Sequence, residues 1–410
     1  MVKNPFSASF YIGNRQKLLE TLPDDAVVIL TAHRKMQEAA DIELTFRQES
    51  NFQYLTGLQE PDWKLVIDKA KNTSFLVSPQ RNSVHVAFDG MLDPALATSI
   101  SGVDKVMSTK QFGRWLKAAK LSHRSVHTLL PQLRMARYMH IALNPALRLL
   151  VRQLRAHGAT PIDCRSQLSK QRAIKQAPEL KALQAAIDLT NKGLESVIAH
   201  RQSFTYEYEY EAELSHVFLG GGADGMAWKP IIASGKNTCT MHHTTNTRAV
   251  KKNDWVLMDV GARLHGYAAD VCRTVPVGTY AGWQAEIFEA VREYHDEAMS
   301  LLRPGLEVSS YIQQSDKILE TKLKALGLMK RRSLKEMRRR MPHAIGHGLG
   351  IDAHDSLGRF ETFQESMVMT VEPGIYVPER EFGVRLESDV VITKDGHRNM
   401  SGDLPLSFIS

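Results

Sequence analysis

Two aspartates stand in the most strand-like part of this sequence, where a hydrophobic core would exclude charged side chains. In the stretch VLMDVGARLHGYAADVCRTV, Asp259 ends one apolar run and Asp270 precedes a second. Gly261 and Gly266 lie between the two runs, so we predict a hairpin of antiparallel strands. Two close carboxylates repel each other unless a proton or a cation lies between them, and burying them unpaired costs several kcal/mol. The pair therefore predicts a metal site on these strands.

Further metal-donor residues follow in similar settings of apolar runs and glycines. They are His347 in HAIGHGLGIDAHD, Glu372 in MVMTVEPGIYV and Glu387 in FGVRLESDVVIT. Together with the two aspartates they form a hard, oxygen-rich set, which suits two divalent cations, manganese, cobalt or zinc, better than a thiolate-bound structural zinc. Arg385 lies two residues before Glu387, so on one strand they would share a face, and the guanidinium could hold a ligating carboxylate in place.

The length and pattern of the chain predict two domains that meet near residue 170. A chain of 410 residues exceeds what one hydrophobic core usually supports. Residues 1–170 alternate strand-like runs with helix-period segments, which predicts an α/β domain. Residues 171–410 combine helices with antiparallel strand pairs, which predicts an α+β domain. We predict a helix across the junction, with a start signal at Pro178 and Glu179.

The charge pattern and the apolar runs predict a cytoplasmic protein with neither a nucleic-acid nor a membrane partner. The net charge is +7, but much of the excess lies in KRRSLKEMRRR, residues 330–340, which we interpret as a solvated helix face or a connecting segment. No aromatic-interleaved or zinc-finger pattern accompanies this basic segment. No apolar run reaches the roughly 18 residues of a membrane helix, and the N-terminus lacks a signal-peptide organisation.

Four strings together carry a resemblance to a known family: MDVGARLHGYAADVCRT, HAIGHGLGIDAHD, TVEPGIYV and VRLESDVVIT. In the same order and at similar intervals, they resemble the metal-binding strands of the creatinase-fold, or pita-bread, metallopeptidases. FRQESNFQYLTGLQEPD, residues 46–62, is similar to the N-terminal domain of Xaa-Pro aminopeptidases, and QRAIKQAPEL resembles the segment where their two domains join. The resemblance implies an α/β N-terminal domain over 1–170 and an α+β, creatinase-like pita-bread catalytic domain over 171–410.

The resemblance also implies roles for individual residues. Glu372 would carry a proton to the leaving group, His242 and His354 would bind substrate and stabilise the intermediate, and His343 would line the substrate pocket. Arg385 and Tyr376 resemble the residues that surround the family's metal ligands. The implied ligands of two divalent metal ions, commonly manganese in this group with cobalt or zinc as alternatives, are Asp259, Asp270, His347, Glu372 and Glu387.

The function implied by the resemblance is that of an Xaa-Pro aminopeptidase, or aminopeptidase P. Such an enzyme is a metal-dependent exopeptidase that hydrolyses the bond between an N-terminal residue and a following proline, using a metal-bridging hydroxide. Its partners would be peptides with proline second and further copies of the chain, in a dimer or tetramer. Two alternatives stay open: a prolidase, and a non-catalytic binding protein on the same fold that uses residues 330–340 for an acidic partner.

Three departures from the family pattern bear on charge and substrate preference. Ser388 stands where these enzymes often have a second acid, so we expect a lower charge around the metals. Trp228 stands where a tyrosine is common, and AFDGMLDP at 87–94 differs from the loop of some bacterial members. We therefore expect the substrate preference to be shifted.

Overall fold

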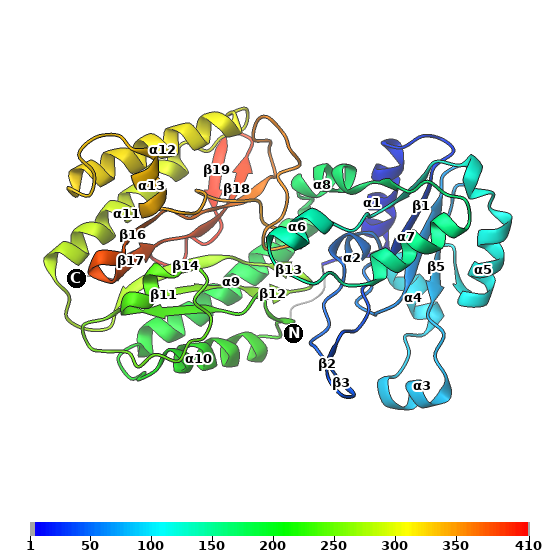
Figure 1. The fold of residues 1–410 in the computed structure, drawn as a ribbon, viewed down its shortest axis with the longest axis horizontal. Helices are drawn as coiled ribbons and strands as arrows, with labels where there is room; N and C mark the ends of the chain where they lie inside the picture. The colour runs from blue at the N-terminus through cyan, green and yellow to red at the C-terminus, as the bar shows by residue number, and fades with distance from the viewer. Residues whose placement is uncertain (1–4, 409–410) are drawn as a thin grey trace. The chain divides into compact units, whose positions relative to one another are not determined.

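The computed structural model describes residues 5–408, and the chain divides into two compact units (Figure 1). One unit covers Phe6–Gln171 and the other begins at Arg172. The division lies inside helix α8 (Arg165–Ala173), and the helix predicted at the junction follows it as α9 (Ala177–His200). Gln176 has an extended backbone between the two helices, and Gln176 and Glu179 cap the new helix reciprocally, with Pro178 in its first turn.

The first unit is built on one mixed sheet. Its described strands pair in the order β6, β5, β4, β1, β7, β8, with antiparallel pairs at the centre and parallel pairs outside. A separate short hairpin pairs β2 with β3. The strand bounds are β1 (Val27–Thr31), β2 (Gln37–Ala39), β3 (Ile42–Glu43), β4 (Lys64–Asp68), β5 (Thr73–Ser78), β6 (Lys105–Ser108), β7 (Val126–Thr128) and β8 (Ile162–Asp163).

Helices cover the faces of this sheet, as the alternating sequence pattern predicts. On one face, Val27 and Ile29 of β1 pack with Phe112 of α5 and with Leu150 and Leu154 of α7, because alternate residues of a strand point the same way. The α/β prediction for this part of the chain is therefore confirmed. The helix bounds are α1 (Ala8–Glu20), α2 (Ser50–Thr56), α3 (Ser83–Asp89), α4 (Pro94–Ser101), α5 (Thr109–Ala118), η1 (Leu121–His123), α6 (Leu133–Tyr138) and α7 (Ala146–Ala156).

The second unit contains small antiparallel sheets, which agrees with the α+β prediction. Strands pair in the orders β10-β11-β14, β13-β12-β9 and β15-β18-β19, and β16 pairs with β17. The strand bounds are β9 (Gly225–Met226), β10 (Ile231–Ser234), β11 (Trp255–Val260), β12 (Ala262–Leu264), β13 (Tyr267–Ala268), β14 (Val271–Pro276), β15 (Val368–Val371), β16 (Gly374–Val377), β17 (Phe382–Arg385), β18 (Ser388–Thr393) and β19 (Gly396–Asn399).

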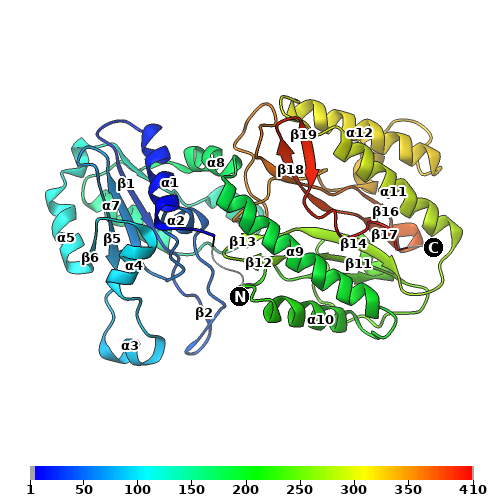
Figure 2. The same cartoon turned by 180° about the vertical axis from the view of Figure 1, so that it is seen from behind.

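Two pairs of helices pack against these sheets. Helices α9 and α10 run side by side along one set of strands, and α11 and α12 lie against another (Figure 2). Each pair closes its own hydrophobic cluster, one around Tyr210 and Val256 and the other around Phe288 and Val371. Among the described helices, none is long and apolar enough to span a membrane. The remaining helices are α10 (Glu207–Gly220), η2 (Gly235–Cys239), α11 (Gly282–Ser300), α12 (Val308–Ala325), α13 (Leu334–Arg340) and η3 (Pro378–Arg380).

The predicted pairing of the two aspartate-bearing strands is confirmed, but the connection between them is longer than a tight hairpin. Strands β11 and β14 pair antiparallel, with Asp259 opposite Cys272. Between them, β12 and β13 form a separate sheet with β9. Gly261 marks the exit from β11, where a Cβ atom would lie 1.9 Å from the carbonyl oxygen of Ala269. The glycine therefore permits a close approach of two backbone segments beside the site.

This close approach predicts a specific loss of stability. Gly261→Ala forces the two segments apart, and we expect it to lower the free energy of unfolding by about 1–3 kcal/mol, as overpacking does. Gly282→Ala is the matched control in the same unit, because its new Cβ meets nothing within 4 Å. Urea unfolding followed by circular dichroism measures both variants. Equal losses in the two variants would contradict this account.

Candidate metal centre

The two aspartates lie side by side on the sheet of β10, β11 and β14. Asp259 belongs to the central strand β11, and Asp270 directly precedes β14. Both are buried, with Asp259 9% and Asp270 4% exposed. The Oδ2 atom of Asp259 accepts a hydrogen bond from Arg385, whereas its Oδ1 atom is buried without a hydrogen-bond partner in the described chain. An unpaired buried carboxylate oxygen is the feature expected where a cation binds.

The other three predicted ligands reach the same place from the neighbouring sheets. Glu372 lies between β15 and β16, and Glu387 lies between β17 and β18. The backbone of Glu387 bridges to Cys272 of β14, and the Glu387 amide donates to the Cys272 carbonyl at 3.0 Å. His347 lies in the loop before β15, where its amide donates to the Thr370 hydroxyl at 3.1 Å. Backbone pairing thus carries all three side chains towards the aspartates.

The donor atoms form groups that share members, and within each group all the donor atoms lie within 4.8 Å of one another. One group joins Asp259, Asp270 and Glu387, and a second joins His347, Glu372 and Glu387. Glu387 belongs to both groups, which is the arrangement needed by two neighbouring cations that share a ligand. The structure therefore brings together all five side chains predicted as ligands. A third group contains Asp270, His347 and His354.

Arg385 begins a chain of hydrogen bonds that surrounds the carboxylates. Its Nη2 group donates to Asp259, and its Nη1 group donates to the Tyr376 hydroxyl at 3.2 Å. That hydroxyl lies 2.9 Å from Nε2 of His343, whose Nδ1 lies 2.9 Å from the carbonyl oxygen of Ala344. The tautomer with the proton on Nδ1 satisfies the tyrosine hydroxyl and both ring nitrogens, because the tyrosine then donates to Nε2.

The expectation that Arg385 and Glu387 share one strand is wrong. Arg385 ends β17, and Glu387 lies in the break before β18. The guanidinium hydrogen-bonds the carboxylate of Asp259, which belongs to another sheet. The guanidinium of Arg385 thus holds a carboxylate of the donor set in place, but this carboxylate is that of Asp259 and not that of Glu387.

His354 is carried on a loop that the start of this unit holds in place. His354 is exposed, and its ring centroid lies 4.0 Å from that of His347. The adjacent Asp355 is buried and accepts from Arg172 at 2.9 Å, while Lys175 lies 3.4 Å from its other oxygen. Two cations, Arg172 in the last turn of α8 and Lys175 between α8 and α9, therefore anchor the loop that presents His354.

The structure leaves His242 exposed, in the loop after η2. Burial lowers the pKa of both His343 and His354, and electrostatic interaction with His242 is a smaller cause in the same direction. All three histidines therefore face one region beside the metal donors.

Sequence reasoning missed Thr370, whose hydroxyl contacts two of the proposed ligands. It accepts from the His347 amide and lies 3.4 Å from Oε1 of Glu372. Thr370 stands two residues before Glu372, and this spacing on a strand could have identified it. Next to Ser388, the buried Asp389 accepts a hydrogen bond from the Asp270 amide at 3.1 Å, and burial raises the pKa of Asp389.

Two family descriptions match most of the chain. "Metallopeptidase family M24" matches residues 181–394, and "Aminopeptidase P, N-terminal domain" matches residues 11–127. The chain belongs to metallopeptidase family M24. It is a metalloaminopeptidase of the aminopeptidase P type, a hydrolase that uses divalent metal ions. The resemblance and the two-part fold class predicted from the sequence are both confirmed.

Similar proteins and structures cover nearly the whole chain. Xaa-Pro aminopeptidase 3 of Homo sapiens is 31% identical over 96% of this chain and 83% of its own. Xaa-Pro aminopeptidase of Escherichia coli strain K12 is 30% identical over 95% and 93%. The low-pH form of aminopeptidase P from E. coli has a TM-score of 0.85 at 28% identity, covering 98% of this chain and 96% of that one. Proline aminopeptidase P II from Yersinia pestis has a TM-score of 0.83 at 27% identity, covering 98% of each chain.

Crowding and burial disturb the charges of this M24 centre. Burial raises the pKa of Asp270 well above its usual range, and the charge of Asp259 adds to the effect. Burial and repulsion from Asp270 do the same to Glu387. Burial also raises the pKa of Glu372 to about 8 and lowers that of His347 to about 4. The set fits divalent cations, because they would neutralise the carboxylates and bind the neutral imidazole.

The raised pKa of Glu372 predicts that the metal-free protein loses stability as the pH rises. The metal-free folded chain keeps a proton on this carboxyl that the unfolded chain releases, between the usual pKa of 4.5 and about 8. The free energy of unfolding should therefore fall across this window, by up to about 1.4 kcal/mol per pH unit for one proton. A divalent cation favours the charged carboxylate, so its stabilising effect should grow with pH.

Thermal unfolding between about pH 5 and pH 8, with a chelator or with manganese chloride, measures this effect. Glu372→Gln removes this titrating group and should reduce the pH dependence of the metal-free protein, to which the raised pKa values of Asp270 and Glu387 also contribute. An equal increase in Tm on adding metal at both ends of the pH range would contradict the prediction.

Proposed function

We propose that this chain is an Xaa-Pro aminopeptidase that holds two divalent cations and removes the N-terminal residue from peptides with proline second. The observation that carries the proposal is the convergence of two donor groups that share Glu387. The names of the relatives, Xaa-Pro aminopeptidases from human to E. coli, support the substrate class. Manganese is the metal we expect, with cobalt or zinc as alternatives, because the donors are mostly carboxylate oxygens.

In this proposal the five donors hold the cations, and the surrounding residues position the substrate. When bound, two divalent cations supply a water of lowered pKa and polarise the scissile carbonyl. Glu372 acts as the proton carrier and passes a proton to the leaving prolyl nitrogen. The free amine of the substrate binds beside Asp259, whose Oδ1 atom has no hydrogen-bond partner in the described chain.

His343 and His354 supply neutral hydrogen-bonding groups around the scissile bond. Burial lowers the pKa of His343 to about 3 and also lowers that of His354, so both imidazoles are uncharged at neutral pH. His354 is exposed beside His347, from where we propose that it donates a hydrogen bond to the oxyanion that develops on the carbonyl. His242 and His343 are proposed to contact the proline ring and the residue before it.

The alternative of a non-catalytic binding protein has less support. It would use the basic residues 330–340 for an acidic partner, but many of their charges already have acidic partners within the same unit. Arg338 lies 2.8 Å from Asp316, and Arg340 is buried with its Nε group 2.9 Å from Glu336. The complete donor set also favours catalysis over binding alone. Cytoplasmic location and assembly into a homo-oligomer remain predictions.

A comparison of peptides tests the proposed activity. We expect the purified full chain with manganese to release the first residue of an Xaa-Pro tripeptide or longer peptide, and to leave an alanine-containing control intact. A strict preference for the Xaa-Pro dipeptide would replace the proposal by a prolidase. Metal binding without turnover of any peptide would overturn the proposed substrate class.

A substitution at the proton carrier tests the role of the site. Glu372→Gln keeps the shape of the side chain, and we expect kcat/KM to fall at least about 100-fold, as in the loss of general acid–base catalysis. Glu365→Gln is the matched control, because Glu365 is an exposed acid seven residues earlier in the chain. Unchanged turnover in Glu372→Gln would exclude this residue from catalysis.

A further inference from the structure

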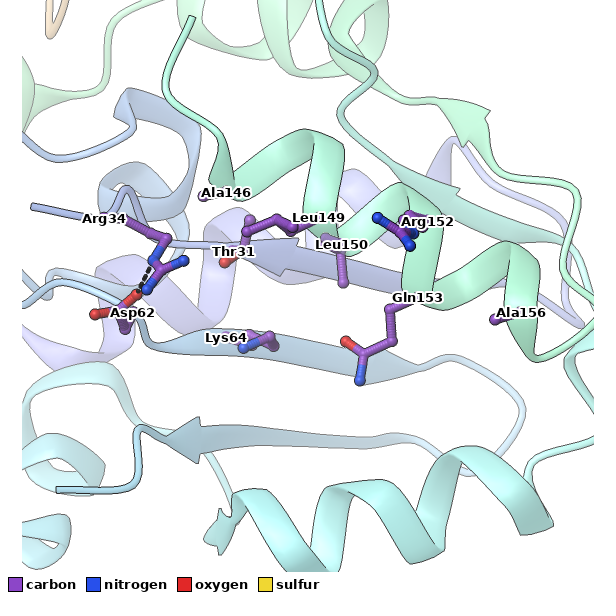
Figure 3. A pocket seen from close by; sticks show the side chains of 10 residues that line it. All are labelled: Thr31, Arg34, Asp62, Lys64, Ala146, Leu149, Leu150, Arg152, Gln153 and Ala156. Atoms are coloured by element: carbon purple, nitrogen blue, oxygen red, sulfur yellow. Dashed lines mark hydrogen bonds and ion pairs between the residues drawn. The ribbon is translucent and has the colours of Figure 1, made fainter. Parts of the chain in front are cut away.

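The N-terminal unit contains a pocket of about 480 Å³ between helix α7 and the sheet (Figure 3). In Figure 3, Leu150 and Gln153 point from the helix towards strand β4, which carries Lys64. Thr31 of β1 is the register partner of Lys64 and lines the same pocket. The volume falls within the range of about 300–1,000 Å³ that is usual for small-molecule sites. The proposed peptidase function does not use this pocket.

Positive charge dominates the lining of the pocket. Its ionisable residues are three cations, Arg34, Lys64 and Arg152, and one carboxylate, Asp62. Asp62 pairs with Arg34 at 3.1 Å, and this pair is partly exposed. The ammonium of Lys64 has no hydrogen bond or ion pair with the described residues, and burial lowers its pKa. Asp62 offsets part of the charge of Lys64 but already pairs with Arg34, so this half-buried ammonium favours the binding of an anion.

Asn144 joins two residues that line this pocket, Arg34 and Ala146. Its Nδ2 group donates to the carbonyl of Arg34 at 2.8 Å, and its Oδ1 atom accepts from the Arg34 amide at 3.2 Å. The same Oδ1 atom accepts from the amide of Ala146, the first residue of α7, at 3.1 Å. One amide side chain thus ties the segment of Arg34 to the helix that supplies Arg152. Such preorganisation reduces the entropy lost on binding.

We propose that this pocket binds a phosphate monoester, with the phosphate at Lys64, Arg34 and Arg152 and an apolar group against Leu149 and Leu150. A phosphate monoester carries a charge of about −1.5 to −2 at pH 7, which matches the excess of cations. Arginine forks and a lysine ammonium are the side chains that hold phosphate oxygens best. The two leucines and two alanines of α7 offer the apolar surface for the rest of the ligand.

Isothermal titration of the full chain with phenyl phosphate tests this proposal. We expect one saturable site, no binding of phenol, and weaker binding of inorganic phosphate. Lys64→Met and Arg152→Met should each weaken the affinity about tenfold, the effect of losing one charge-assisted hydrogen bond. The affinity should also fall as salt is added.

Arg155→Met is the matched control, because it removes the same charge from the exposed part of α7 outside the pocket lining. We expect it to change the affinity less than twofold. An equal loss of affinity in Arg152→Met and Arg155→Met would mean that binding depends on diffuse surface charge and not on the pocket. This result would overturn the proposal. Absence of saturation at about 10 mM, or binding insensitive to both pocket substitutions, would overturn it as well. Arg152 is exposed, so its variant remains informative if Lys64→Met lowers stability.

Discussion

The repulsion among buried carboxylates is the constraint on which the catalytic unit depends. Asp259, Asp270 and Glu387 bring their oxygens within 4.8 Å of one another in a place with little water. Arg385 offsets part of this charge at Asp259, and the rest remains for cations to neutralise. The sheets that deliver these side chains therefore fold against an electrostatic penalty that hydrophobic packing behind them must exceed.

The donor residues could be predicted because each carries a local sequence signature. Asp259, His347 and Glu372 are polar residues beside strand-like runs and glycines, and such contrasts are visible without any structure. The partner of Arg385 could not be predicted in this way. That contact depends on how β17 lies against β11, two strands far apart in the sequence. Neither the hydrophobic period nor the spacing of residues within one strand predicts such an arrangement.

The helices and strands show the same limit between local and long-range information. The start of α9 follows from Pro178 and its capping residues, which act within one turn of the chain. The excursion of β12 and β13 between the aspartate strands was missed, because it depends on pairing with β9, some forty residues earlier. Alternation of apolar residues identifies a strand but does not name its partner.

The anchoring of the His354 loop sets a limit on where a shortened chain can begin. Arg172 and Lys175 precede α9, outside the region in which the donors lie, yet they hold Asp355 next to His354. A fragment that starts at α9 would retain every donor and release this loop. The smallest fragment with an ordered active centre must therefore include the last turn of α8, although that turn supplies none of the donors.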